Sequence, residues 1–170
     1  MSDWPFVGEV PGNPIGKGRA RGTAVGGYVR MYTPKKTADW ESGAAMVLGA
    51  YWRRAPLEGC LEVEIMAMSA RPKRLLRRKD PDGLMWKPSK PDSDNIEKST
   101  WDALVKAGVI RDDCMVVLNR TWCCYAPRDR GPVGGIPSLA LYMLRIRRLT
   151  WSLLGFRCSS RWESLSLSCV

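Results

Sequence analysis

Six carboxylates between positions 92 and 113 stand out because the 170-residue chain is otherwise strongly basic, with a net charge of +10. They are Asp92, Asp94, Glu97, Asp102, Asp112 and Asp113, and only three cations lie among them. Carboxylates repel phosphate, so a basic protein that binds nucleic acid gains nothing from them unless a divalent cation intervenes. Magnesium prefers oxygen ligands and is usually held by a few carboxylates together with waters and substrate phosphates. The segment therefore predicts a metal site of the kind that a metal-dependent nuclease needs.

The spacing of these residues favours a group at the start of a helix. Asp92 and Asp94 lie two positions apart in an extended lead-in, where both side chains can point to one side. Lys98 follows Asp94 by four residues, which places it on the same helical face one turn later. The helix then reverses at Gly108, and Asp113 opens the next strand. Asp113 could return toward the first two carboxylates if that strand lies beside the start of the helix.

Each of these residues also has a purely structural interpretation. Asp94 could be the N-cap of the helix, with Glu97 three residues later completing a capping box. Asp92 could be a turn residue, and residues 112–113 could form a polar turn before the strand. Lys98 could serve only to pair with an acid on a solvated helix face. The metal-site hypothesis rests on finding all of them together in a basic chain.

The rest of the composition excludes several kinds of catalytic site and indicates the kind of molecule that the protein binds. The chain has no histidine, which excludes Ser-His-Asp and Cys-His catalysis and every zinc site that needs an imidazole ligand. The cationic excess predicts a polyanionic partner, most simply nucleic acid, with an anionic membrane surface as the weaker choice. Residues 10–38 contain no acid, and residues 71–90 hold eight cations against two acids. Either segment could be a solvated surface loop, but the excess of cations favours phosphate contact through Lys17, Arg19, Arg21, Lys35, Lys36, Arg71, Lys73, Arg74, Arg77 and Arg78.

The elements that must position these residues follow from periodicity and from turn signals. Thr33 and Pro34 predict a helix start, with a capping hydroxyl and a proline at the first helical position, and helical spacing continues to about Arg54. A second helix is expected over residues 96–107, and strands over about residues 4–10, 61–67, 115–123 and 138–146. A loose hairpin is expected around Gly26-Gly27. This order predicts one α/β domain over residues 1–148, with a mixed β-sheet flanked by two main helices, and a Ser-rich tail of unknown role at residues 149–170.

Cysteine usage and the N-terminus indicate an intracellular protein. The six cysteines include no CxxC pair, so we expect reduced thiols rather than a disulfide framework. The N-terminal residues lack the basic and apolar regions of a signal peptide. The most apolar stretch, residues 136–156, is interrupted by arginines and is not expected to span a membrane. These features predict a soluble, cytoplasmic protein.

The motif of residues 91–113 resembles a known family. It reads P-D-x-D-N-x-x-K, then D-A-L, then K-A-G-x-x-x-D-D, and is similar to the signature of RusA-type Holliday junction resolvases, endodeoxyribonucleases common in bacteria and their prophages. The earlier segment GKGRARG followed by YVRMYTPKKTADWE is similar to the N-terminal region of that family. The resemblance covers roughly residues 5–148, which makes those residues a RusA-like endonuclease domain.

The resemblance implies a homodimeric α/β nuclease that binds four-way DNA junctions and uses magnesium to cut two opposed strands symmetrically. It implies that Asp92, Asp94 and Asp113 are catalytic metal ligands and that Lys98 is an active-site lysine. Asn95 and Asp112 match frequent neighbours in the motif, as supporting residues. Cys123 stands where many members carry a lysine at the end of a strand, and the tail after about residue 149 has no recognised counterpart.

A mechanism follows from charge. One or two magnesium ions, a choice that the sequence leaves open, would hold the scissile phosphate and activate a bound water, while Lys98 would offset charge on the phosphate. A two-fold dimer would present two equivalent sites to two strands. Two alternatives remain: a branched- or single-stranded-DNA-binding protein without catalysis, whose aspartates are caps and turns, and a nuclease that acts on other branched DNA, on flaps or on RNA.

Overall fold

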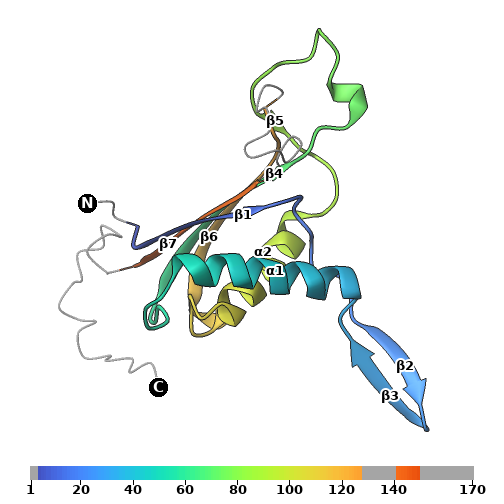
Figure 1. Ribbon diagram of the computed structural model, residues 1–170, viewed down its shortest axis with the longest axis vertical. Helices are drawn as coiled ribbons and strands as arrows, with labels where there is room; N and C mark the ends of the chain where they lie inside the picture. The colour runs from blue at the N-terminus through green and yellow to red at the C-terminus, as the bar shows by residue number, and fades with distance from the viewer. Residues whose placement is uncertain (1–3, 128–140, 150–170) are drawn as a thin grey trace, which may run out of the picture.

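The computed structural model describes residues 4–127 and 141–149, and these form one mixed α/β sheet domain (Figure 1). Five strands form the main sheet in the order β1-β7-β4-β6-β5. Their bounds are Phe6–Pro11 for β1, Leu141–Arg148 for β7, Leu61–Ser69 for β4, Val116–Tyr125 for β6 and Met85–Trp86 for β5. The helices are α1, Lys35–Tyr51, and α2, Ser93–Lys106. The predicted fold class is confirmed.

The centre of the sheet is a crossover unit, in which β4 leads through α2 to β6. The two strands run parallel, from the pair Leu61 and Val116 to the pair Ser69 and Tyr125. Parallel neighbours require a crossover connection, so α2 runs antiparallel to both strands. The start of α2 therefore lies at the edge of the sheet where β4 and β6 end. Strand β7 pairs antiparallel with β4 and β1, and β5 pairs antiparallel with β6.

Both helices pack against one face of the sheet. Alternate residues of β4 point to this face and are buried, and they are Leu61, Val63, Ile65 and Ala67. They share one hydrophobic cluster with Ala44 and Leu48 of α1 and with Ile96, Ala103 and Leu104 of α2. The period of two in the strand and the helical spacing thus converge on one core. Burial at these positions fixes the orientation of α2, and with it the position of its first turn.

The start of α2 differs from the sequence-based expectation. The helix begins at Ser93, and Asp92 rather than Asp94 is its N-cap residue. Asp94 lies in the first turn, so the predicted capping box is wrong. A carboxylate in the first turn is favourable because the unpaired N–H groups there carry partial positive charge. Similarly, α1 begins one residue later than predicted, with Pro34 at its N-cap and no side-chain cap.

Two extensions project from the sheet domain (Figure 1). The first is a hairpin, here called the arm, made of β2 (Arg21–Val25) and β3 (Tyr28–Tyr32), which pair only with each other and turn at Gly26-Gly27. The second, here called the basic loop, covers residues 72–84 and contains the short 3-10 helix η1, Lys73–Leu75. A further 3-10 helix, η2, covers Asp113–Met115. The predicted hairpin around Gly26-Gly27 is confirmed.

None of the helices in the described part of the chain is long and apolar enough to cross a membrane. Residues 138–140 of the predicted last strand lie outside the described residues, and so does the tail from residue 150. The division into a domain and a tail therefore stays a prediction.

Candidate active site

The first two predicted metal ligands lie at the start of α2. Asp92 precedes the first helical residue, and Asp94 is in the first turn. The end of β6 is close by, because the backbone N–H of Lys87 donates to the carbonyl of Cys123 at 3.0 Å and residues 87–93 share a pocket with Cys123. In sheets of parallel strands, ligands bind at the edge where the strands end, next to the starts of the following helices. Asp92 and Asp94 occupy that position.

The two carboxylates are available to a ligand. Asp92 makes no side-chain capping hydrogen bond to α2, although it is the N-cap residue. Asp94 accepts a hydrogen bond from Nζ of Lys98 at 3.2 Å, and the two side chains are 59% and 56% exposed. An exposed pair of this kind contributes about 0.3–0.5 kcal/mol, so a phosphate or a metal ion can replace it at little cost. The predicted proximity of Lys98 to Asp94 is thus present in the structure.

A groove runs past Asp92. Three open pockets of about 540, 650 and 500 Å³ adjoin one another, because Pro91 lines all three and Asp92 lines the second and third. Asn95 lines the pocket on one side of Asp92. The cations along the groove are Arg19, Arg21 and Lys36 near the arm, Lys17 and Lys90 beside Asp92, and Lys87 next to Cys123. A carboxylate therefore lies within a groove whose charged lining is otherwise cationic.

The third predicted metal ligand lies elsewhere. Asp113 is in η2, which follows the end of α2 and leads into the start of β6. The Asp113 pKa is raised mainly by its hydrogen bond to Asp112 and to a smaller extent by the charge of Asp102, its neighbour among the acids of α2. Asp102 lies about 12 Å along the helix axis from Asp94. Within one chain, the expectation that Asp113 returns to the start of the helix is wrong, because β6 starts at the far end of α2. Among the described residues, no three or more acids, cysteines or histidines are grouped so as to hold a metal ion.

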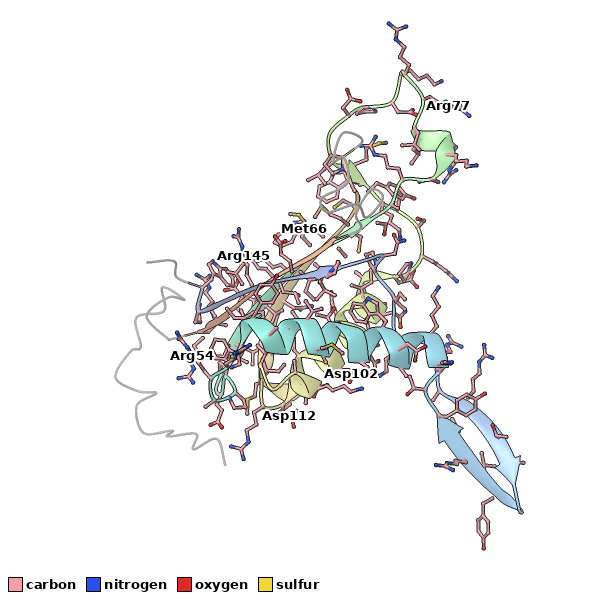
Figure 2. The ribbon with its side chains drawn as sticks, in the orientation of Figure 1. Arg54, Met66, Arg77, Asp102, Asp112 and Arg145 are labelled. Carbon is pink, nitrogen blue, oxygen red and sulfur yellow. The ribbon has the colours of Figure 1, made fainter. Side chains whose placement is uncertain are left out.

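Asp112 and Asp113 form their own hydrogen-bonded pair beyond the end of α2, and Figure 2 labels Asp112 there. The backbone N–H of Cys114 donates to Asp112 at 3.0 Å, and this bond together with its contact to Asp113 lowers the Asp112 pKa. The hydrogen bond to Asp112 in turn raises the Asp113 pKa, because the two carboxyls favour one shared proton. Asp113 is therefore the member of the pair that is easier to protonate.

Two of the predicted phosphate-binding residues have partners inside the protein. Nζ of Lys17 donates to Glu41 at 2.8 Å and to Asp102. Arg71 is 9% exposed, and its guanidinium donates to the carbonyls of Ala126, Pro81, Asp82 and Gly83. These side chains connect elements of the fold, so their assignment to phosphate contact is not supported by their surroundings.

The other predicted phosphate-binding residues are all exposed. They are Arg19, Arg21, Lys35 and Lys36 around the arm and Lys73, Arg74, Arg77 and Arg78 on the basic loop. Figure 2 shows Arg77 near the outer end of that loop. Lys87 and Lys90 line the groove but were not singled out from the sequence, although they belong to the basic segment of residues 71–90.

Cys123 lines the pocket beside Asp92, at the position where the resemblance leads us to expect a lysine. Burial raises the pKa of its thiol above the ordinary value, and the nearby Lys87 only partly opposes this. The thiol is therefore neutral at physiological pH. The positive charge at this end of the groove comes from Lys87, whose Nζ donates to the carbonyls of Ser89 and Lys90 at 2.7 and 2.6 Å.

Comparisons with known proteins identify the family. A family model described as "Endodeoxyribonuclease RusA" matches residues 11–130, a range that contains the arm, the basic loop and all the carboxylates discussed above. A Bacillus subtilis (strain 168) protein named "Uncharacterized protein YqaN" is 29% identical over 113 residues, which cover 64% of this chain and 79% of that protein. The match to the family model covers well over half of the chain. The protein described here therefore belongs to the RusA endodeoxyribonuclease family.

Proposed function

We propose that the protein is a magnesium-dependent endodeoxyribonuclease that resolves Holliday junctions by paired, symmetric cuts as a homodimer. One observation carries the proposal: two exposed carboxylates lie at the start of α2, and one of them, Asp92, lines a groove whose other charged residues are cations. Membership of a family of endodeoxyribonucleases supports the reaction type. The net charge of +10 supports a DNA substrate.

The residues at the start of α2 fit a magnesium ion. Magnesium is usually held by one or two carboxylates, with substrate phosphates and waters completing the octahedron. Asp92 and Asp94 supply that number of carboxylates, and the absent capping bond leaves the Asp92 oxygens accessible. When bound, the metal would supply Lewis-acid activation of water and of the scissile phosphate.

The chain's own residues would orient the phosphate and balance its charge. Lys98 lies one turn after Asp94 and would offset negative charge that develops on the phosphate oxygens. The N–H groups of the first turn of α2 would attract the same phosphate, because they carry partial positive charge. Asn95 lies in the pocket beside Asp92, where its amide would hydrogen-bond to the phosphate or to a metal-bound ligand.

A dimer would explain how Asp113 takes part. Within one chain Asp113 lies toward the far end of α2 from Asp92 and Asp94, so it cannot complete their site. A two-fold related chain presents the same elements in the opposite direction. We therefore propose that Asp113 of one chain joins Asp92 and Asp94 of its partner. Two such composite sites would act on two opposed strands.

The test is cleavage of a labelled synthetic four-way junction, with linear duplex, flap and RNA controls. Paired symmetric nicks should appear only in the junction with magnesium, and should disappear with EDTA and in Asp94→Asn. That substitution removes charge but keeps shape, so activity should fall at least 100-fold while junction binding in EDTA stays unchanged. Tight junction binding without cleavage under any divalent metal would leave the protein a DNA-binding protein. Cleavage of the flap or RNA in preference to the junction would reassign the substrate.

The same assay distinguishes a composite site from a site within one chain. Asp94→Asn and Asp113→Asn chains, each inactive alone, are co-refolded so that they exchange partners. If the site is shared, the mixed dimer has one intact site and regains single-strand nicking of the junction. If each site is confined to one chain, both sites of the mixed dimer carry a substitution, and the mixture stays inactive.

A further inference from the structure

The arm has two chemically different faces. Cross-strand partners in an antiparallel pair lie on the same face, and neighbouring residues of a strand lie on opposite faces. The pairs Arg21 with Tyr32 and Thr23 with Arg30 therefore share one face, and Tyr28 belongs to the same face. The pairs Gly22 with Met31 and Ala24 with Val29 form the other face. The first face carries cationic and aromatic side chains, and the second carries only glycine and apolar side chains.

The cationic and aromatic face is open to solvent. Every residue of β3 is exposed, and Tyr28, the first residue after the Gly26-Gly27 turn, is 82% exposed. Figure 1 shows the arm pointing away from the sheet and both helices. Strands β2 and β3 pair only with each other within the described part of the chain. An isolated two-stranded hairpin is marginally stable in water, so a partner that covers this face would stabilise the arm.

Charge identifies DNA as that partner. No acid occurs in residues 10–38, so nothing on the arm or its base offsets Arg21 and Arg30. The groove that contains Asp92 continues to the base of the arm. Its pocket nearest the arm is lined by Arg19, Arg21 and Lys36, and it shares Arg19 and Pro91 with the pocket that Asp92 lines. DNA that reaches the carboxylates would therefore pass the arm.

Aromatic rings on such a face stack on bases, whereas arginines contact phosphates. In linear duplex every base-pair face inside the helix is covered by its neighbour. At the branch point of a four-way junction, base-pair faces are open or easily opened. A strand of five residues spans about 17 Å, so a ring at the tip of the arm can reach a branch point while its base contacts the backbone near the groove.

We propose that the arm recognises the branch point, with Tyr28 stacking on an exposed base-pair face and Arg21 and Arg30 contacting the adjacent phosphates. The contact selects branched over linear DNA. The inference rests on the proposed function, since it assigns the structure selectivity of that same activity to a particular element.

The test is equilibrium binding in EDTA, so that no DNA is cut, to a four-way junction and to a linear duplex of the same sequence. Tyr28→Ala should weaken binding to the junction about tenfold, within the range of about 5- to 150-fold for the loss of one stacked base, and should leave duplex binding within about twofold. Tyr28→Phe keeps the ring and should behave as the wild type. Val29→Ala is the matched control, since Val29 is an exposed residue of the same strand on the opposite face.

A second readout is the fluorescence of 2-aminopurine placed beside the branch point. Wild type and Tyr28→Phe should change its intensity through ring stacking, and Tyr28→Ala should not. Circular dichroism and the melting temperature should be the same for all variants, because the arm strands pair only with each other.

Two binding results would overturn the inference: an unchanged junction preference in Tyr28→Ala, or an equal loss of affinity for both DNAs. A molar mass of Tyr28→Ala that differs from that of the wild type in light scattering would also overturn it, because it would show that the arm contacts a second copy of the chain. Failure of the proposed function is distinguishable, because the wild type would then leave the junction uncut with magnesium or would show no preference for the junction over the duplex. If the wild type prefers the junction and Tyr28→Ala keeps that preference, only the proposed role of the arm is overturned, and the proposed function stands.

Discussion

The ammonium group of Lys17 is held between two carboxylates from different helices, Glu41 of α1 and Asp102 of α2. The backbone of Lys17 also donates to the carbonyl of Asn95. Burial of the ammonium opposes its charge, but the hydrogen bonds to Asp102 and Glu41 and their negative charges outweigh this and raise the Lys17 pKa above 10.5. At the scale of single residues, this lysine stabilises the packing of the two helices next to the groove.

Replacing Lys17 with methionine should lower the free energy of unfolding by about 1–3 kcal/mol near neutral pH, because hydrogen bonds between charged groups are lost. Since the folded-state pKa is raised, the stabilisation is fully present below pH 10.5 and is lost as pH rises through the higher folded-state value. Urea unfolding of wild type and Lys17→Met across this range should show their difference shrinking above that pH.

The control for Lys17 is Lys106→Met. Lys106 is an exposed lysine of α2 whose Nζ donates to the uncharged hydroxyl of Ser42 at 2.7 Å. Its loss should change stability by less than about 0.5 kcal/mol. Equal effects of the two substitutions would contradict a specific role for Lys17.

At the scale of elements, the basic loop is closed at its neck by Arg71. The guanidinium donates to three carbonyls near the end of the loop, at residues 81–83, and to the carbonyl of Ala126 after β6. The loop thus presents its exposed cations from a fixed base beside the edge of the sheet where β4 and β6 end. The same edge carries Asp92 and Asp94, so loop and carboxylates can contact one DNA molecule.

The neck gives a direct prediction. Arg71→Met leaves the carbonyl of the buried Ala126 without this donor and removes the part-buried bonds to residues 81–83. The free energy of unfolding should therefore fall by about 1–3 kcal/mol, and the loop should open locally. Limited digestion with subtilisin, followed by mass spectrometry, should show faster cleavage within residues 72–84. Arg78→Gln, which changes an exposed cation of the same loop, should be cleaved at the wild-type rate. Identical digestion of Arg71→Met and wild type would show that Arg71 does not hold the loop.

At the scale of the whole molecule, the exposed cations lie at both ends of the sheet domain, and only one group of them surrounds the groove. The exposed cations around the arm, the groove and the basic loop lie toward the end of the molecule where α1 and α2 begin. Arg54 lies beyond the opposite end of α1, as Figure 2 shows. Its guanidinium lies over the Trp52 ring. A phosphate backbone bound along the groove would contact the first group and not Arg54.

Salt dependence measures this difference. Each phosphate contact contributes about 0.9 to the slope of log affinity against log salt concentration for duplex DNA. Arg19→Gln and Lys36→Gln should each reduce the slope by about 1 and weaken junction and duplex binding alike. Arg54→Gln should leave the slope unchanged. If all three substitutions shift the slope equally, the charge acts through the overall field of the protein and not through the groove.

The sequence by itself determined the elements and the chemistry of the groups they carry. The periodicity of residues 35–51 and 93–106, the alternation of β4 and the paired glycines of the arm are local patterns, and local sterics and hydrogen bonding are enough to specify them. The carboxylates Asp92 and Asp94 were recognisable for the same reason, since both belong to one short segment next to one helix.

Tertiary structure decided which distant groups meet. Lys17 is separated by 24 residues from Glu41 and by 85 from Asp102, and no local pattern encodes either pairing. The position of Asp113 follows from the crossover of β4, α2 and β6, which places residues before the helix at one edge of the sheet and residues after it toward the other. Residues before and after a helix are thus separated in space by the length of that helix. In contrast, the segment of residues 87–93, which contains Asp92, lies next to Cys123 of β6 because of the way the sheet packs.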